Sequence, residues 1–203
     1  MIRPLYLNLG VALLALVAGA CSSVQPVHYY TLVPPAGGAA EAGAATGFQF
    51  DLLPVGVPAQ VDQPQLVVRQ GAQGVAVLQG ERWIAPLGDE VRGALAAALA
   101  HEFHAKDVSG LPGQGSGTVR IKLDLRRLDS VPGGYAYIDA AWSVRSLKGG
   151  DALACTSRIN QTVGEGYDAL VQGHQQAIAQ LASQVGAVAA AMAGGTTAHC
   201  PAG

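Results

Sequence analysis

Two stretches of the 203-residue chain repeat apolar residues at spacings of three and four, the pattern of an amphipathic helix. The first predicts a helix over residues 87–104, with Pro86 near its first turn, where the missing N–H costs little. The second begins near Asp168 and predicts one helix of about 25 residues, because Gly194 and its glycine neighbour interrupt the pattern.

Three long strands are predicted between these helices. Residues 119–126 alternate strictly between apolar and charged side chains, so one face of that strand is buried and the other is wet. Residues 135–147 and 152–163 follow after glycine-rich turns, which together predict an antiparallel meander. Shorter strands are expected at 28–32 and 48–52.

Residues 65–69 and 75–78 form two further short β segments around a glycine turn and predict a hairpin. The order is then strands, helix, three-strand meander, helix. We therefore predict an α+β fold, in which two long helices pack on one face of an antiparallel sheet.

The N-terminal pattern is that of a bacterial lipoprotein signal. Arg3 precedes an apolar run over residues 5–17, and small residues lead directly into Cys21. Residues 1–20 are thus a predicted signal peptide, and Cys21 is the predicted site of lipid attachment. Ser22 after the cysteine, where aspartate would favour the inner membrane, indicates sorting to the outer membrane.

Two other readings of this segment are weaker. The apolar run is too short for a transmembrane helix, which needs about 20 apolar residues. A secreted protein cleaved before Cys21, with the cysteine incidental, is the other alternative. The mature chain would then divide into a tether over 21–27, one domain over 28–192 and a tail over 193–203, disordered unless Cys200 is tied down.

The charge and the cysteine content of the chain limit its possible partners and crosslinks. A net charge of −2 argues against nucleic acid as the main partner. In an oxidising compartment, Cys155 and Cys200 could close a disulfide across about 45 residues, or remain two unpaired thiols. The spacing leaves these two alternatives open.

The sequence shows no complete catalytic or metal-binding motif. His101 and His104 are three residues apart, whereas a zinc-protease helix needs histidines at i and i+4. His174 falls on the apolar side of the last helix and is expected to be a core histidine. Glu90 and Asp129 are predicted to be exposed, solubilising carboxylates. No metal or other cofactor is expected.

Several separated segments resemble one known family. They are Cys21-Ser22-Ser23, Tyr29-Tyr30-Thr31-Leu32, Val57-Pro58, Gln65-Leu66-Val67, Arg82-Trp83-Ile84-Ala85-Pro86-Leu87 and Gly166-Tyr167-Asp168. Their order and spacing over roughly residues 28–190 resemble the ABC-type transport auxiliary lipoproteins, which include the Pqi-type outer-membrane lipoproteins.

The resemblance implies a lipid-anchored periplasmic protein that is not an enzyme. Proteins of this kind work with an MCE-domain (mammalian cell entry) protein in moving lipids or other hydrophobic compounds between two membranes. The implied role is to dock that partner at the outer membrane, and the protein could form a homo-oligomer.

Three aromatic residues, Tyr29, Tyr30 and Trp83, serve either core packing or a partner interface. Two other functional classes stay open. One is a lipoprotein that holds a lipid tail in its own apolar pocket, and the other is a hydrolase with an unfamiliar site.

Overall fold

A meander of three long strands forms the centre of the molecule. The computed structural model describes residues 26–35, 47–111 and 117–202, so the signal peptide, Cys21 and most of the tether lie outside the described residues. Strands β6 (Thr118–Val131), β7 (Tyr135–Ser146) and β8 (Leu153–Thr162) pair antiparallel in succession, which confirms the meander.

Two short strands extend the meander into a five-stranded sheet of order β5-β2-β6-β7-β8. Strand β2 (Gln49–Leu52) runs parallel to β6, and β5 (Lys106–Asp107) runs parallel to β2. The expectation of a purely antiparallel sheet is therefore wrong. Helix α2 (Leu87–Phe103) lies between β2 and β5 in the chain, and a crossover of this kind returns the chain in the same direction.

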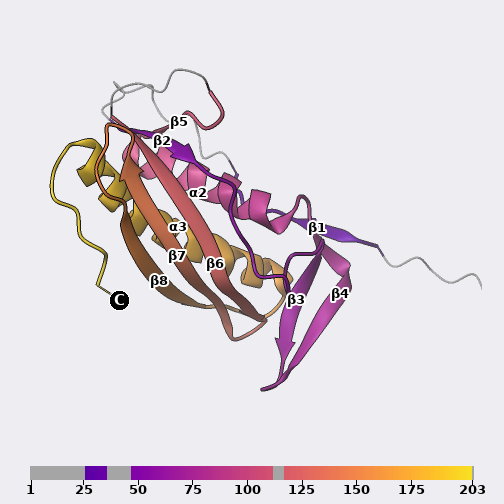
Figure 1. Ribbon diagram of the computed structural model, residues 1–203. Coiled ribbons are helices and arrows are strands. Elements are labelled where there is room, and N and C mark those ends of the chain that lie inside the picture. The colour runs from indigo at the N-terminus through magenta and orange to yellow at the C-terminus, as the bar shows by residue number, and fades with distance from the viewer. Residues whose placement is uncertain (1–25, 36–46, 112–116, 203) are drawn as a thin grey trace, which may run out of the picture.

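A second, three-stranded sheet of order β1-β4-β3 stands at the end of the molecule where the chain enters (Figure 1). Strands β3 (Gln65–Gln70) and β4 (Gly74–Trp83) form the predicted hairpin. Strand β1 (His28–Tyr30) pairs parallel with β4, which is again a mixed arrangement. The prediction of one sheet is thus corrected to two mixed sheets in an α+β fold.

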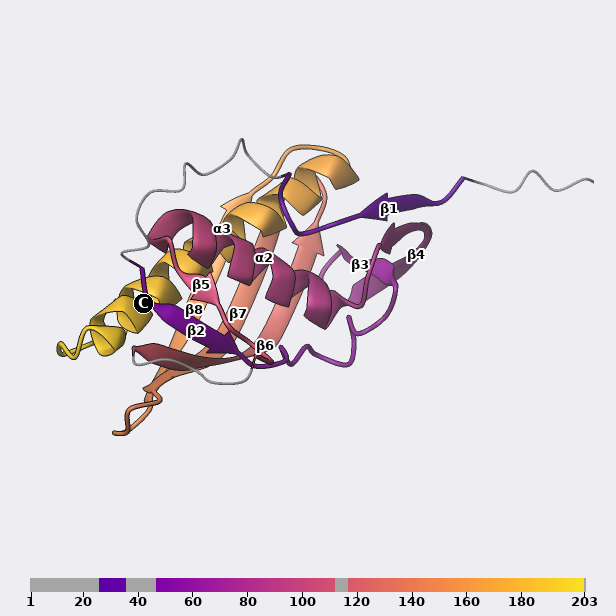
Figure 2. The ribbon, with the colours of Figure 1, turned by 90° about the horizontal axis from the view of Figure 1, so that it is seen from above.

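Both helices lie on the same side of the five-stranded sheet (Figure 2). Helix α3 (Tyr167–Ala193) covers β6, β7 and β8, and α2 packs mainly against α3. The helices approach closely at Gly186, where an added Cβ would overlap the ring of Phe103. The main core cluster includes Leu95, Leu99, Ile121, Leu123, Trp142, Val144, Ile178 and Leu181.

We expect Leu123→Ala to lower the free energy of unfolding by about 2–5 kcal/mol, because the leucine is fully buried opposite Trp142 and its truncation leaves a cavity. Urea unfolding of the purified domain measures this loss. Lys122→Ala is the matched control, since Lys122 is exposed on the opposite face of the same strand, and it should stay within about 0.5 kcal/mol of the parent. Equal stability of the two variants would contradict the face assignment.

Candidate functional site

A hydroxyl and an imidazole meet in the core between β6 and α3. Ser130 Oγ lies 2.8 Å from Nε2 of His174, a contact that resembles a nucleophile next to its base. The two residues are 44 positions apart in the sequence, so no local sequence motif predicts the pair. Nδ1 of His174 is buried without a hydrogen-bond partner, so no carboxylate orients the ring.

This pair is closed off from substrate. The cavity beside it has a volume of about 10 Å³, roughly the space of one water molecule, and is lined by apolar side chains including Leu66, Trp83 and Leu170. Burial lowers the pKa of His174 to about 4, although the nearby Asp129 carboxylate opposes the shift. His174 is therefore a neutral core residue at neutral pH, as its place on the apolar helix face predicted.

The face of the five-stranded sheet that points away from the helices has a distinctive charge pattern. Its charged residues that are exposed as whole residues are basic: Lys106, Lys122, Arg126, Arg127, Arg145 and Arg158. The acidic residues of the same face are less exposed, since Asp51 and Asp129 are buried and Asp139 is half-buried. Asp124 is the most exposed of them, and its carboxylate pairs with Lys122 at 3.1 Å. We call this surface the cationic face.

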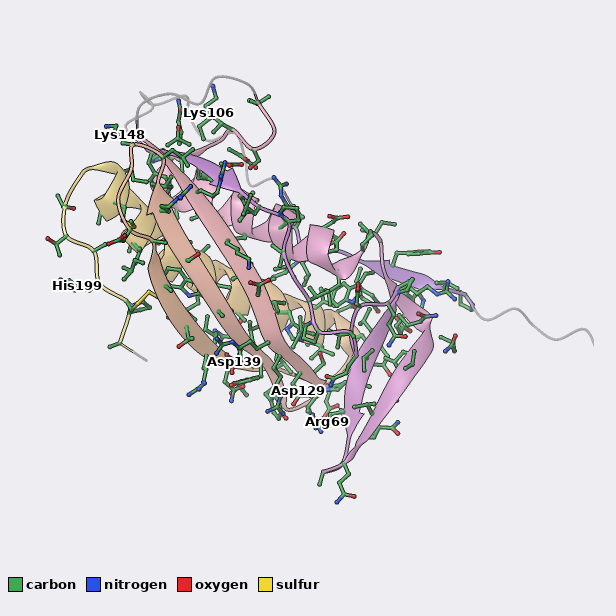
Figure 3. All side chains as sticks on the ribbon, viewed as in Figure 1. Arg69, Lys106, Asp129, Asp139, Lys148 and His199 are labelled. Atoms are coloured by element: carbon green, nitrogen blue, oxygen red, sulfur yellow. A yellow bond between two sulfur atoms is a disulfide. The ribbon has the colours of Figure 1, made fainter. Side chains whose placement is uncertain are left out.

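Ion pairs hold the recessed carboxylates in place. Arg120 Nε donates to Asp51 at 2.8 Å, and Arg158 Nε lies 3.5 Å from Asp139. Asp139 and Asp129 lie toward the same end of the sheet, whereas Lys106 and Lys148 lie at the opposite end (Figure 3). In both pairs the arginine side chain is more exposed than the carboxylate, which leaves the positive charge outermost there.

A hollow of about 490 Å³ opens on the cationic face. It is lined by Lys122, Arg126, Trp142 and the strand β8 around Cys155, and the C-terminal residues Cys200 and Pro201 form its rim. Cys155 and Cys200 are joined by a disulfide with a Cα–Cα distance of 5.5 Å. The disulfide attaches the segment that follows α3 to the edge strand of the sheet.

The three aromatic residues singled out in the sequence occupy one region but differ in exposure. Tyr29 is 58 % exposed, Tyr30 is partly buried, and Trp83 is 6 % exposed in the core. The Tyr30 hydroxyl donates to Glu81 at 2.7 Å, and burial together with this carboxylate raises the pKa of Tyr30. Of the three, Tyr29 offers its ring to a partner.

Two carboxylates have roles that the sequence did not indicate, and their predicted exposure is wrong. Glu90, 4 % exposed, accepts hydrogen bonds from the Leu32 amide at 2.7 Å and the Thr31 hydroxyl at 2.8 Å. Asp129, 6 % exposed, accepts from Arg69 at 2.9 Å and also pairs with Arg127. Burial raises the pKa of Asp129, but these hydrogen bonds outweigh it and lower the pKa overall. Their fixed long-range partners could not be read from local periodicity.

Within the described ranges, no group of three or more His, Cys, Asp or Glu side chains could hold a metal ion. Among the helices of those same residues, none is long and apolar enough to cross a membrane. The cationic face and the three-stranded sheet, where the chain enters the domain, are the candidate functional surfaces of the described residues.

Comparison with known proteins identifies related folds. The model of the ABC-type transport auxiliary lipoprotein component family matches residues 30–186. An uncharacterized protein of known crystal structure is 18% identical, with a TM-score of 0.65, and the match covers 80% of this chain and 97% of that one. A Xanthomonas campestris protein of the DUF330 family is 14% identical, with a TM-score of 0.59, covering 86% and 97%. None of the curated proteins matches the sequence.

We expect the contribution of His174 to the free energy of unfolding to fall as the pH drops from about 6.5 to about 4, and this contribution to level off below. In this window the unfolded chain binds a proton at His174 that the folded chain excludes, because burial lowers the pKa of that imidazole in the folded state. Urea unfolding across this pH range measures the slope. His174→Gln should flatten it, and His101→Gln, at an exposed helix end, should not. An unchanged slope in the His174 variant would contradict the assignment.

We further expect reduction of the Cys155–Cys200 disulfide to lower the free energy of unfolding by about 3–4 kcal/mol, because the crosslink closes a loop of 45 residues in the unfolded chain. Thermal unfolding with and without a thiol reductant reports the difference. The double variant Cys155→Ala/Cys200→Ala should unfold at the lower temperature in either condition. A parent protein indifferent to reductant would show that the crosslink contributes no stability.

Proposed function

Because the chain belongs to the family of ABC-type transport auxiliary lipoprotein components, we propose that it is a non-catalytic adaptor of a transport system. In this proposal an acyl group on Cys21 anchors the domain at the periplasmic face of the outer membrane. The domain there binds an MCE-domain protein that carries lipids or other hydrophobic compounds between the two membranes. The cationic face is the surface that meets this partner.

The cationic face is the observation that carries the proposal. Its residues that are both charged and exposed are basic although the whole chain has a net charge of −2, and no helix of the described residues covers it. Such a segregated surface favours a partner with an acidic counter-surface, since complementary charge speeds association and selects the partner. The open hollow beside Lys122 and Arg126 can accept a side chain of the partner.

The enclosed core supports an adaptor over the two alternatives. A lipid carrier needs an apolar cavity that holds an acyl chain, and the cavity between sheet and α3 has about 10 Å³. A hydrolase needs a reachable nucleophile, and the Ser130 hydroxyl lies in the same enclosed space with His174. Neither chemistry has access to a substrate at this place.

The anchor is supported by the sequence of residues 1–21 alone, since these lie outside the described residues. Cys21→Ser should therefore leave uncleaved precursor or release the domain from the outer-membrane fraction. A mature-size variant that still fractionates with the outer membrane would contradict the anchoring part of the proposal.

We expect Lys122→Glu/Arg126→Glu to weaken binding to the MCE-domain protein at least about tenfold, because two cations of the interface become anions. Crosslinking and affinity capture with the acylated chain measure the binding. Lys148→Glu, compared with the single variant Lys122→Glu, is the matched control, since it makes the same charge change on an exposed lysine in the turn between β7 and β8, at one end of the sheet.

The adaptor role fails if no MCE-domain protein is captured while the purified chain turns over an ester, a phosphoester or a peptidoglycan fragment at a rate that His174→Ala abolishes. Equal binding by the two charge-reversed variants would leave the adaptor role and remove the cationic face from it. Crosslinks between copies of the chain in the same samples test the homo-oligomer.

A further inference from the structure

The large apolar side chains that remain exposed are concentrated on the three-stranded sheet. Seven such residues are exposed among the described residues, and five of them belong to this sheet or flank its strands: Val27, Tyr29, Val75, Val77 and Ile84. Tyr29 of β1 and Ile84, which directly follows β4, are 58 % and 61 % exposed, and apolar residues gathered in this way mark an interaction surface.

The strand register places these residues on one side of the sheet. Tyr29 is paired with Arg82, which is paired in turn with Gln65 of β3. Val67, two residues beyond Gln65, is paired with Val77 across an irregular stretch of β4. Paired residues share a side, and side chains alternate along each strand outside the irregular stretch. Within that stretch β4 has three more residues than β3, which shifts the alternation so that Val77 and Arg82 share a side. Val27, Val75 and Ile84 follow by that alternation. We call this side the outer side of the small sheet.

The opposite side belongs to the core and fixes which side is free. Leu66, Val68 and Trp83 alternate with the outer residues and are all at most 6 % exposed. Glu81, the carboxylate of β4, also lies on that inner side, where it is paired with His28. The paired residues of the outer side include no carboxylate. Of their two charged members, Arg69 is bonded to the buried Asp129 of β6, so Arg82, which is paired with Tyr29, is the basic group beside the exposed apolar residues.

We propose that the outer side of the small sheet lies on the surface of a phospholipid bilayer. This inference rests on the proposed acylation of Cys21. Val27 is the sixth residue after Cys21, so the chain between them spans at most about 22 Å. An acyl chain inserted at Cys21 therefore keeps the small sheet beside the lipid headgroups. A side of valine, isoleucine, tyrosine and arginine without carboxylates suits the interface, where aromatic rings and basic groups favour the headgroup layer.

The contact orients the domain and does not anchor it. The acyl chain supplies the membrane affinity. It also holds a few apolar side chains close to the bilayer, and their high effective concentration there favours their contact with lipid. Removal of the contact should therefore leave the protein in the membrane fraction but let the domain tumble on its tether. The cationic face belongs to the other sheet and stays free for a protein partner.

The test uses the full acylated chain reconstituted into vesicles of phosphatidylethanolamine and phosphatidylglycerol, part of which carries bromine near the top of the acyl chains. Tyr29→Trp places a reporter on the outer side of the small sheet. Thr156→Trp places the matched control at an exposed position of β8, on the cationic face. The parent protein supplies the baseline of Trp83 and Trp142, which are buried. We expect the reporter at position 29 to emit at shorter wavelength and to lose at least half of its added fluorescence to brominated lipid, and the control to lose none.

Equal and unquenched emission at positions 29 and 156 would overturn the membrane contact. A photocrosslinker at Ile84 that joins a second copy or the MCE-domain protein in place of lipid would overturn it too, because the outer side would then be a protein interface. The mass of the purified chain reports acylation of Cys21 separately. The anchor and the contact can therefore fail independently, and an unacylated chain whose reporter stays unquenched overturns both.

Discussion

Two buried carboxylates hold the three-stranded sheet to the rest of the molecule. Glu90 of α2 accepts hydrogen bonds from Leu32 and Thr31, which follow β1, and Asp129 of β6 is paired with Arg69 of β3. A buried carboxylate is costly unless donors satisfy it, so each one requires its partner segment in one position. The small sheet is thereby fixed at two of its three strands, and with it the point where the chain enters the domain.

This attachment gives the molecule two surfaces with different chemistry in a fixed relation. The small sheet exposes apolar groups next to the entry of the chain, and the five-stranded sheet exposes basic groups. Helix α3 stiffens the second surface from behind, since it packs across β6, β7 and β8. A domain that must hold one protein in a defined orientation to a membrane needs this kind of rigidity between its two contacts.

The long elements could be predicted from the sequence because their periodicity is strong. The helices over 87–103 and 167–193 and the meander of β6, β7 and β8 need only local patterns of burial. Strands β1, β2 and β5 have two to four residues, and so short a pattern carries no information on strand direction or on which sheet it joins. Ser130 with His174 and Glu90 with Leu32 are contacts across 44 and 58 residues, which only the fold brings together. The outer side of the small sheet was visible in the sequence only as Tyr29.

The parallel pairing of β2 with β6 also sets an order of events in folding. Gln49 pairs with Thr118, 69 residues later in the chain, whereas the strands of the meander pair with their immediate neighbours in sequence. Closing the longer loop costs more entropy before any contact repays it. We therefore expect the meander to form first and β2 to join it late. In a chain that emerges from its N-terminus, β2 then has no strand to pair with until β5 and β6 have followed, so this strand stays open while more than fifty further residues are delivered.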